Sequence, residues 1–138
     1  MVTAQPGPDI IGYDAHCFPA PRHSFLQQWL QPPHRALTAL TSRGMGGYAV
    51  ARSCRSGFKV GPLFADDAQT ALELLGELAS ACDGGDLNID VPATQVDFIA
   101  ALEAAGFSPT FSTTRMYKGT PPKLDANRVF GVTTLELG

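Results

Sequence analysis

The acidic residues that could do acid–base chemistry stand at the ends of predicted elements. Asp66 and Asp67 precede a run with helical periodicity, and Asp90 closes the short apolar run 87–91. Open α/β sheets bind ligands outside the carboxyl ends of their strands, which makes Asp90 a candidate base. An aspartate before Val91-Pro92 equally caps the next helix or holds a turn. Both interpretations stay open at this point.

The thiol and imidazole groups are a weaker candidate for chemistry. His16, Cys17, His23 and His34 are near one another in the sequence, but their spacing matches no zinc pattern. The chain has three cysteines, an odd number without a Cys-x-x-Cys pair, which does not indicate a disulfide framework. We therefore expect no metal site and reduced cysteines.

The first half of the chain predicts a helix and an antiparallel meander. Residues 1–12, rich in proline and glycine, are expected to be a flexible tail, and residues 13–138 a single domain. Apolar residues at helical spacing predict a helix over 21–30, which Pro32-Pro33 ends. Glycine-rich turns then separate three predicted strands, at 36–41, 48–52 and 58–64.

The second half changes its period and predicts alternating helices and strands. A helix begins at Asp66 or Asp67, and the strand 87–91 should follow it through a right-handed crossover. The next helix should bury Val96, Ile99 and Leu102. Two further strands are expected, one over 107–117 with alternating side chains and one over 129–137. The fold class is therefore α/β (α+β) with one mixed sheet.

Composition excludes several classes of function. The net charge is −3, and the ten lysines and arginines are scattered, so we expect no nucleic-acid partner. The N-terminus lacks a signal-peptide pattern, and no apolar stretch is long enough to cross a bilayer. We expect no membrane partner and a cytoplasmic location.

Several separate motifs occur in one order along the chain: K-V-G-P-L-F-A-D at 59–66, A-x-x-L-L at 71–75, D-V-P at 90–92, G-F at 106–107, R-M-Y-x-G at 115–119 and V-F-G-V-T-T-L-E-L-G at 129–138. Together they resemble the GNAT acyltransferase superfamily. The likeness is closest to the C-terminal domain of bacterial tandem-GNAT proteins, and it covers about residues 13–138.

The resemblance implies a GNAT-like fold with a V-shaped splay between the strands 58–64 and 87–91. It also implies acetyl-CoA as a cofactor, whose pantetheine arm would lie along Val60, Gly61, Pro62, Leu63, Phe64 and Ala65. The pyrophosphate would sit at the N-terminus of the following helix, where free N–H groups and the helix dipole attract anions.

The sequence departs from the family at two positions that the resemblance makes functional. The phosphate loop of the family reads Gln or Arg, two residues, Gly, one residue, then Gly or Ala. Here 66–71 reads D-D-A-Q-T-A, in which only Ala71 matches and two carboxylates would repel a pyrophosphate. The tyrosine that many GNAT enzymes use as a general acid is replaced by Leu102, which we expect in the core.

The remaining candidates are assigned by the resemblance and by residue chemistry. Asp90 and Glu136, with Glu73 and the histidines behind them, are candidates for the base, and Tyr117 or Tyr48 for the acid. The expected substrate contacts are Arg115, Arg52 and Tyr48. Arg115 equally suits an internal ion pair with Asp90 or Glu136.

Three functional hypotheses follow. The first is an acyl-CoA-dependent N-acyltransferase acting on an amine of a small molecule or peptide. The second is a degenerate GNAT-fold interaction domain that no longer binds CoA and packs against another GNAT domain or a second copy. The third is a binding module that holds a small anionic or amine ligand without reaction, through contacts with Arg52, Arg115 and Tyr117. An open splay with a free helix N-terminus favours the first, and a filled splay favours the second.

Overall fold

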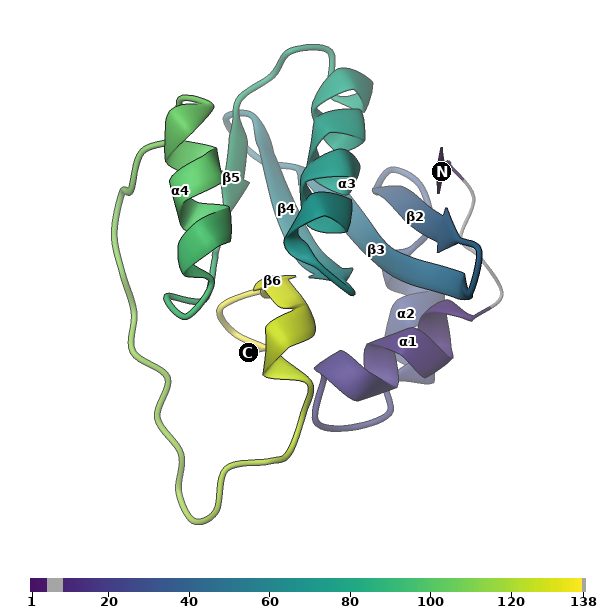
Figure 1. Cartoon of the computed structure of the whole chain (residues 1–138), viewed down its shortest axis with the longest axis vertical. Coiled ribbons are helices and arrows are strands. Elements are labelled where there is room, and N and C mark those ends of the chain that lie inside the picture. The colour runs from purple at the N-terminus through teal and green to yellow at the C-terminus, as the bar shows by residue number, and fades with distance from the viewer. Residues whose placement is uncertain (5–8, 138) are drawn as a thin grey trace.

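A computed structural model describes residues 1–4 and 9–137 of the chain. Its centre is a six-stranded sheet in which β1 to β5 follow one another in space, while β6 pairs with β4 (Figure 1). The strands β2 to β4 are antiparallel and β4 and β5 are parallel, so the predicted mixed α/β architecture is confirmed. None of the helices within those described ranges is long and apolar enough to cross a bilayer.

The meander lies close to its predicted position, as β2 (Arg35–Thr41), β3 (Gly44–Ser53) and β4 (Phe58–Ala65). Gly44 and Gly57 take positive φ angles of 111° and 76° at the two turns, which glycine adopts without steric cost. At the outer edge β1 (Val2–Thr3) pairs with β2, and Ile10 is buried, although a flexible tail was expected there. Residues 5–8 of that expected tail lie outside the described residues.

The connection that follows β4 joins two parallel strands through a helix, as predicted. Asp67 caps α3 (Ala68–Ala81), which buries Ala71, Leu74, Leu75 and Leu78 against the sheet. The strand β5 (Leu87–Ile89) then runs parallel to β4. The helix α4 (Val96–Ala104) buries Phe98 and Leu102, so Leu102 is a core residue as expected. Val96 was expected to face inward, but 68% of it is exposed because it begins the helix.

Two helical layers cover the sheet, and alternation along β3 decides which side chains face each layer. Ala49 and Ala51 belong to the core under α3 and α4, whereas Tyr48 and Val50 belong to the core under α1 (Ile10–Cys17) and α2 (His23–Trp29). Figure 1 shows the two helix pairs on opposite sides of the strands. The sequence analysis did not predict α1, because apolar and polar residues are not clearly separated on two faces of this helix.

The two C-terminal strands expected from the sequence are largely absent. Residues 107–117 form no strand. Phe107 is half-buried, and all residues from 108 to 117 are exposed. Of the strand expected over 129–137, only β6 (Val129–Gly131) forms, after the short 3-10 turn Ala126–Arg128. The strand predicted over 107–117 is therefore wrong, because an alternating pattern does not show whether a neighbouring strand is present to pair with it.

Candidate functional site

The parallel strands β4 and β5 pair only at their beginnings. Their register is Phe58 with Leu87, Lys59 with Asn88 and Val60 with Ile89. We call the space between the two strands beyond these pairs the wedge. The strand β6 enters the wedge and pairs with Leu63 and Phe64, and the Val132 N–H donates to the Asp90 carbonyl at 3.0 Å. We call residues 129–133, which comprise β6 and the two residues after it, the C-terminal segment. This segment therefore occupies the space where the expected splay would open.

Gly61 makes this close approach possible. A Cβ atom there would lie 2.3 Å from the Thr133 carbonyl oxygen and 2.6 Å from the Val132 carbonyl oxygen. The register of β3 against β4 also shifts here, so Gly61 and Pro62 together face Val50 as a bulge. A side chain at position 61 and the C-terminal segment in the wedge are sterically incompatible.

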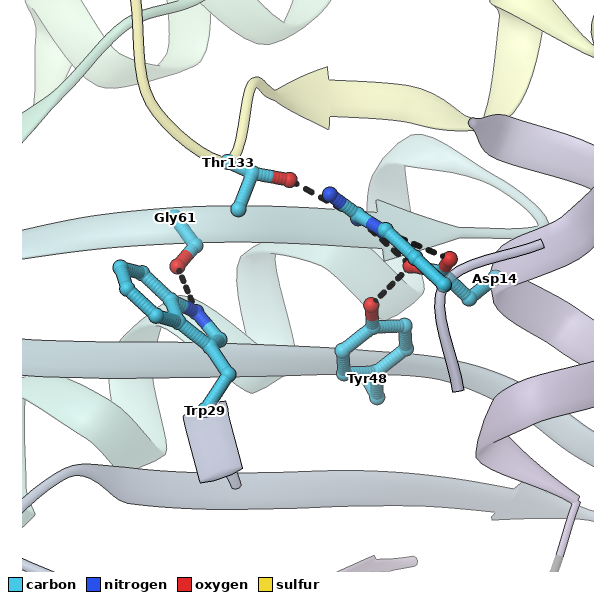
Figure 2. A network of polar contacts seen from close by, with 6 residues as sticks. Asp14, Trp29, Tyr48, Gly61 and Thr133 are labelled. Carbon is cyan, nitrogen blue, oxygen red and sulfur yellow. Dashed lines mark hydrogen bonds and ion pairs between the residues drawn. The ribbon is translucent and has the colours of Figure 1, made fainter. Parts of the chain in front are cut away.

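A buried polar network joins α1, the start of α2, β3 and the C-terminal segment (Figure 2). Arg22 forms a bidentate pair with Asp14, with Nη2–Oδ1 2.6 Å and Nε–Oδ2 2.8 Å, and the two side chains are 7% and 1% exposed. Arg22 also donates to Thr133 at 2.9 Å, and the Tyr48 hydroxyl donates to Asp14. Burial, followed by the nearby Asp14 charge, raises the pKa of Tyr48 and keeps it neutral.

A second contact holds α2 to the wedge. The Trp29 Nε1–H donates to the Gly61 carbonyl at 3.0 Å, which Figure 2 also shows. The guanidinium of Arg52 lies 5.6 Å from the Trp29 ring centroid, a distance compatible with a cation–π interaction. The helix α2 thus restrains β4 at the bulge.

The N-terminus of α3 is occupied by acidic side chains. Asp67 Oδ1 accepts a hydrogen bond from the Thr70 N–H at 2.8 Å, and this bond lowers the pKa of Asp67. Asp66 accepts from the Tyr13 hydroxyl at 2.8 Å and lies 3.5 Å from Arg128. A broad, open hollow of about 750 Å³ lies beside them, lined also by His16 and Arg43. Both carboxylates therefore stand where an anion would bind.

Replacing Asp67 by alanine should lower the free energy of unfolding by about 1 kcal/mol, because the cap of α3 is lost. Asp67→Asn should keep most of the stability, since asparagine also caps helices. The folded pKa lies below the ordinary 3.8, so this stabilisation is present above that value and is lost as the pH falls through the folded pKa. Urea unfolding at neutral and acidic pH measures the effect. Equal stability of native protein and D67A at neutral pH would contradict it.

The structure gathers only some of the predicted site residues at the wedge. Val60 to Ala65 form the buried part of β4, and Asp90 lies at the end of β5 in a 2.7 Å ion pair with Lys59. Tyr48 is fully buried in the polar network. Arg115 and Tyr117 lie in the exposed segment, so the pair of Arg115 with Asp90 is not formed.

Glu136 lies in an exposed turn at the C-terminal end, where hydrogen bonds from its own N–H and from Thr134 lower its pKa. Sequence reasoning missed Asp14, Arg22 and Thr133 as site residues. Asp14 and Arg22 lie in no motif, and Thr133 lies within the motif at 129–138 without a role of its own, so all three are recognised only by their burial. Within residues 1–4 and 9–137, no cluster of three or more His, Cys, Asp or Glu side chains is placed to hold a metal ion.

Comparison with protein families decides the relationship. The family model of the acetyltransferase (GNAT) domain matches residues 10–131. This chain belongs to that GNAT family. The match spans every described element of the fold except β1, and it includes both strands that bound the wedge. The resemblance seen in the sequence motifs is thereby confirmed.

Two of the similar proteins are longer than this GNAT domain. Holothin acyltransferase of Pseudoalteromonas sp. (strain SANK 73390) is 29% identical over 139 residues, covering 99% of this chain and 47% of that protein. A proposed acetyltransferase from Pyrococcus horikoshii has a TM-score of 0.78 at 18% identity, over all of this chain and 45% of the other. A variant of TTHA1254 from Thermus thermophilus has a TM-score of 0.62 at 14% identity, over 87% of this chain and 99% of the other. The chain spans about half the length of the first two relatives.

The residues present do not fit acetyl-CoA in this arrangement. The edge of β4 that would face a pantetheine arm is paired with β6, and the carbonyls of Val132 and Thr133 cover Gly61. The first N–H groups of α3 include that of Thr70, which Asp67 already binds. Cofactor binding here would require the C-terminal segment to leave the wedge.

Proposed function

We propose that this chain serves acyl transfer, as a GNAT domain of an acyl-CoA-dependent N-acyltransferase whose acceptor is an amine of a small molecule or peptide. The family match over residues 10–131 carries this proposal. The likeness to an acyltransferase over 99% of the chain supports it. Transfer between two bound reactants depends mainly on their positioning, which by itself lowers a barrier by several kcal/mol.

Asp90 is the base candidate that the fold supports best. It closes β5 at the wedge, and the Lys59 ammonium at 2.7 Å holds its carboxylate in place. Glu136 is exposed near the C-terminal end, and Tyr117 is 49% exposed on the segment outside the sheet. Either of them would have to move to reach the wedge, whereas Asp90 already borders it.

A second candidate function is favoured by the filled wedge. A GNAT domain whose C-terminal segment pairs with β4 and whose α3 begins with two aspartates would act by contacting another domain, without binding CoA itself. In this case the domain provides a surface that contacts the other domain, and the other domain catalyses acyl transfer.

Thermal unfolding measured with and without acetyl-CoA distinguishes the two proposed functions. A ligand at about 100 times its Kd stabilises the native state by roughly 2.7 kcal/mol, which raises the Tm by a few degrees. The first function predicts this rise for the native sequence. The matched variant Asp66→Gly with Asp67→Ala removes both carboxylates from the N-terminus of α3.

Each outcome decides between the functions. A rise in the native chain supports acyl-CoA binding, and the acceptor amine can then be sought by product analysis. A rise only in the double variant shows that the two carboxylates exclude the cofactor, which supports the second function. No rise in either chain contradicts acyl-CoA binding by this domain.

A further inference from the structure

Residues 108–117 have the composition of a β-strand, but they pair with no strand in the described structure. Every residue from 108 to 123 is exposed, and the backbone hydrogen bonds of the described chain pass from Phe107 directly to Leu124. Figure 1 shows this segment passing outside the sheet and helices between α4 and β6, and its end, Arg115 to Tyr117, lines a hollow of about 210 Å³ with Pro19 and Leu137. Its threonines and aromatic residues favour strands, and Phe111 and Met116 are 68% and 86% exposed. Both apolar side chains are therefore available for burial against a partner.

The same chain has a sheet edge without a strand. The spatial order of β1 to β5 ends at β5, whose outer side pairs with no strand among residues 1–4 and 9–137. Unprotected edges of this kind readily accept another strand. The carbonyls of Asp86 and Asp90 accept hydrogen bonds on the inner side, from the N–H groups of Phe58 and Val132. Because backbone groups alternate in direction along a strand, those of Leu87 and Ile89 in β5 face the outer edge.

The two features have complementary charges. The segment carries Arg115 and is followed directly by Lys118, and no acidic residue occurs from 107 to 119. The approach to β5 carries the exposed residues Asp83 and Asp86. Opposite charges on adjacent strands favour pairing, and like charges would oppose it.

We propose that residues 108–117 of one chain pair with the β5 edge of a second copy, and that the exchange is reciprocal. Each copy then gives one strand and receives one, so a two-fold dimer satisfies both free strands and both free edges at once. Phe111 and Met116 become buried between the copies. This inference concerns assembly and does not depend on acyl transfer.

The test compares three chains by sedimentation velocity over a wide range of concentration. The native chain and Thr114→Ala, which keeps its backbone N–H, should form dimers. A chain with both Thr113→Pro and Thr114→Pro lacks two consecutive N–H groups, which point to opposite sides of a strand. One of them would have to face the partner strand, so this double-proline chain should be monomeric. Thr113 and Thr114 are exposed and have no hydrogen bond in the described structure, so all three chains should fold and give the same far-UV circular dichroism spectrum.

A disulfide experiment identifies the contact itself. Cys54, the exposed native cysteine, is first replaced by serine. Mild oxidation of a mixture of Asn88→Cys and Thr114→Cys chains should give a covalent heterodimer. The double variant should also link between copies. A native chain that stays monomeric, a dimer of the double-proline chain, or a disulfide formed within one chain of the double-cysteine variant would each overturn the proposal.

Discussion

Replacing Arg22 by methionine is expected to lower the free energy of unfolding by about 3–5 kcal/mol, the usual cost of leaving one charge of a buried pair without its partner. Asp14 is 1% exposed, and Arg22 provides both bonds of the bidentate contact. Without the guanidinium, the Tyr48 hydroxyl is the remaining described donor to the Asp14 side chain. Urea unfolding with linear extrapolation measures the change.

Two further variants make this result specific. Arg43→Met removes an exposed arginine in a turn, and it should change stability by no more than about 0.5 kcal/mol. The quadruple variant Asp14→Leu, Arg22→Met, Tyr48→Phe and Thr133→Val replaces the whole network by apolar groups, including the buried Thr133 hydroxyl that accepts from Arg22. It should recover much of the loss, because none of these side chains then carries a buried polar group without a partner. A loss for Arg22→Met as small as that for Arg43→Met would show that the network does not hold the fold.

Gly61→Ala should be the second most damaging substitution, with a loss of about 3 kcal/mol, at the upper end of the range for overpacked sites. The new methyl group would lie 2.3 Å from one backbone carbonyl and 2.6 Å from another, and neither can rotate away. The C-terminal segment has to move instead. Hydrogen exchange at the Val132 N–H, which donates to Asp90, should therefore become faster.

Gly76→Ala is the matched control for this prediction. Gly76 is exposed within α3, and nothing lies within 4 Å of a Cβ atom placed there. Alanine should raise the free energy of unfolding by about 0.5–1 kcal/mol, because glycine is a poor helix former. Unchanged stability and unchanged exchange in Gly61→Ala would mean that the C-terminal segment does not lie against β4.

The meander, α3 and β5 could be predicted because local signals determine them. Gly44 and Gly57 allow the turns, Asp67 provides the cap, and apolar residues recur at the spacing of one buried face. The buried position of Leu102 followed from the same periodicity. In these elements the local preference of the chain and its tertiary packing agree.

The C-terminal third of the sheet could not be predicted, because pairing between distant strands leaves no local signal. Nothing near Val129 indicates that β6 pairs with β4, and nothing near Thr114 indicates that its extended segment lacks a neighbour. Asp14 and Arg22 were missed for the same reason. A buried ion pair formed across a loop resembles two surface charges until the fold places it.

Trp29 gives the wedge an optical signal of its own. It is the single tryptophan of the chain, and its indole N–H bonds the carbonyl of Gly61. Indole emission depends on the polarity and hydrogen bonding around the ring. The tryptophan fluorescence of the protein, excited selectively over that of its three tyrosines, therefore comes from the point where the C-terminal segment crosses β4. Displacement of that segment can thus be followed in real time without attaching a dye.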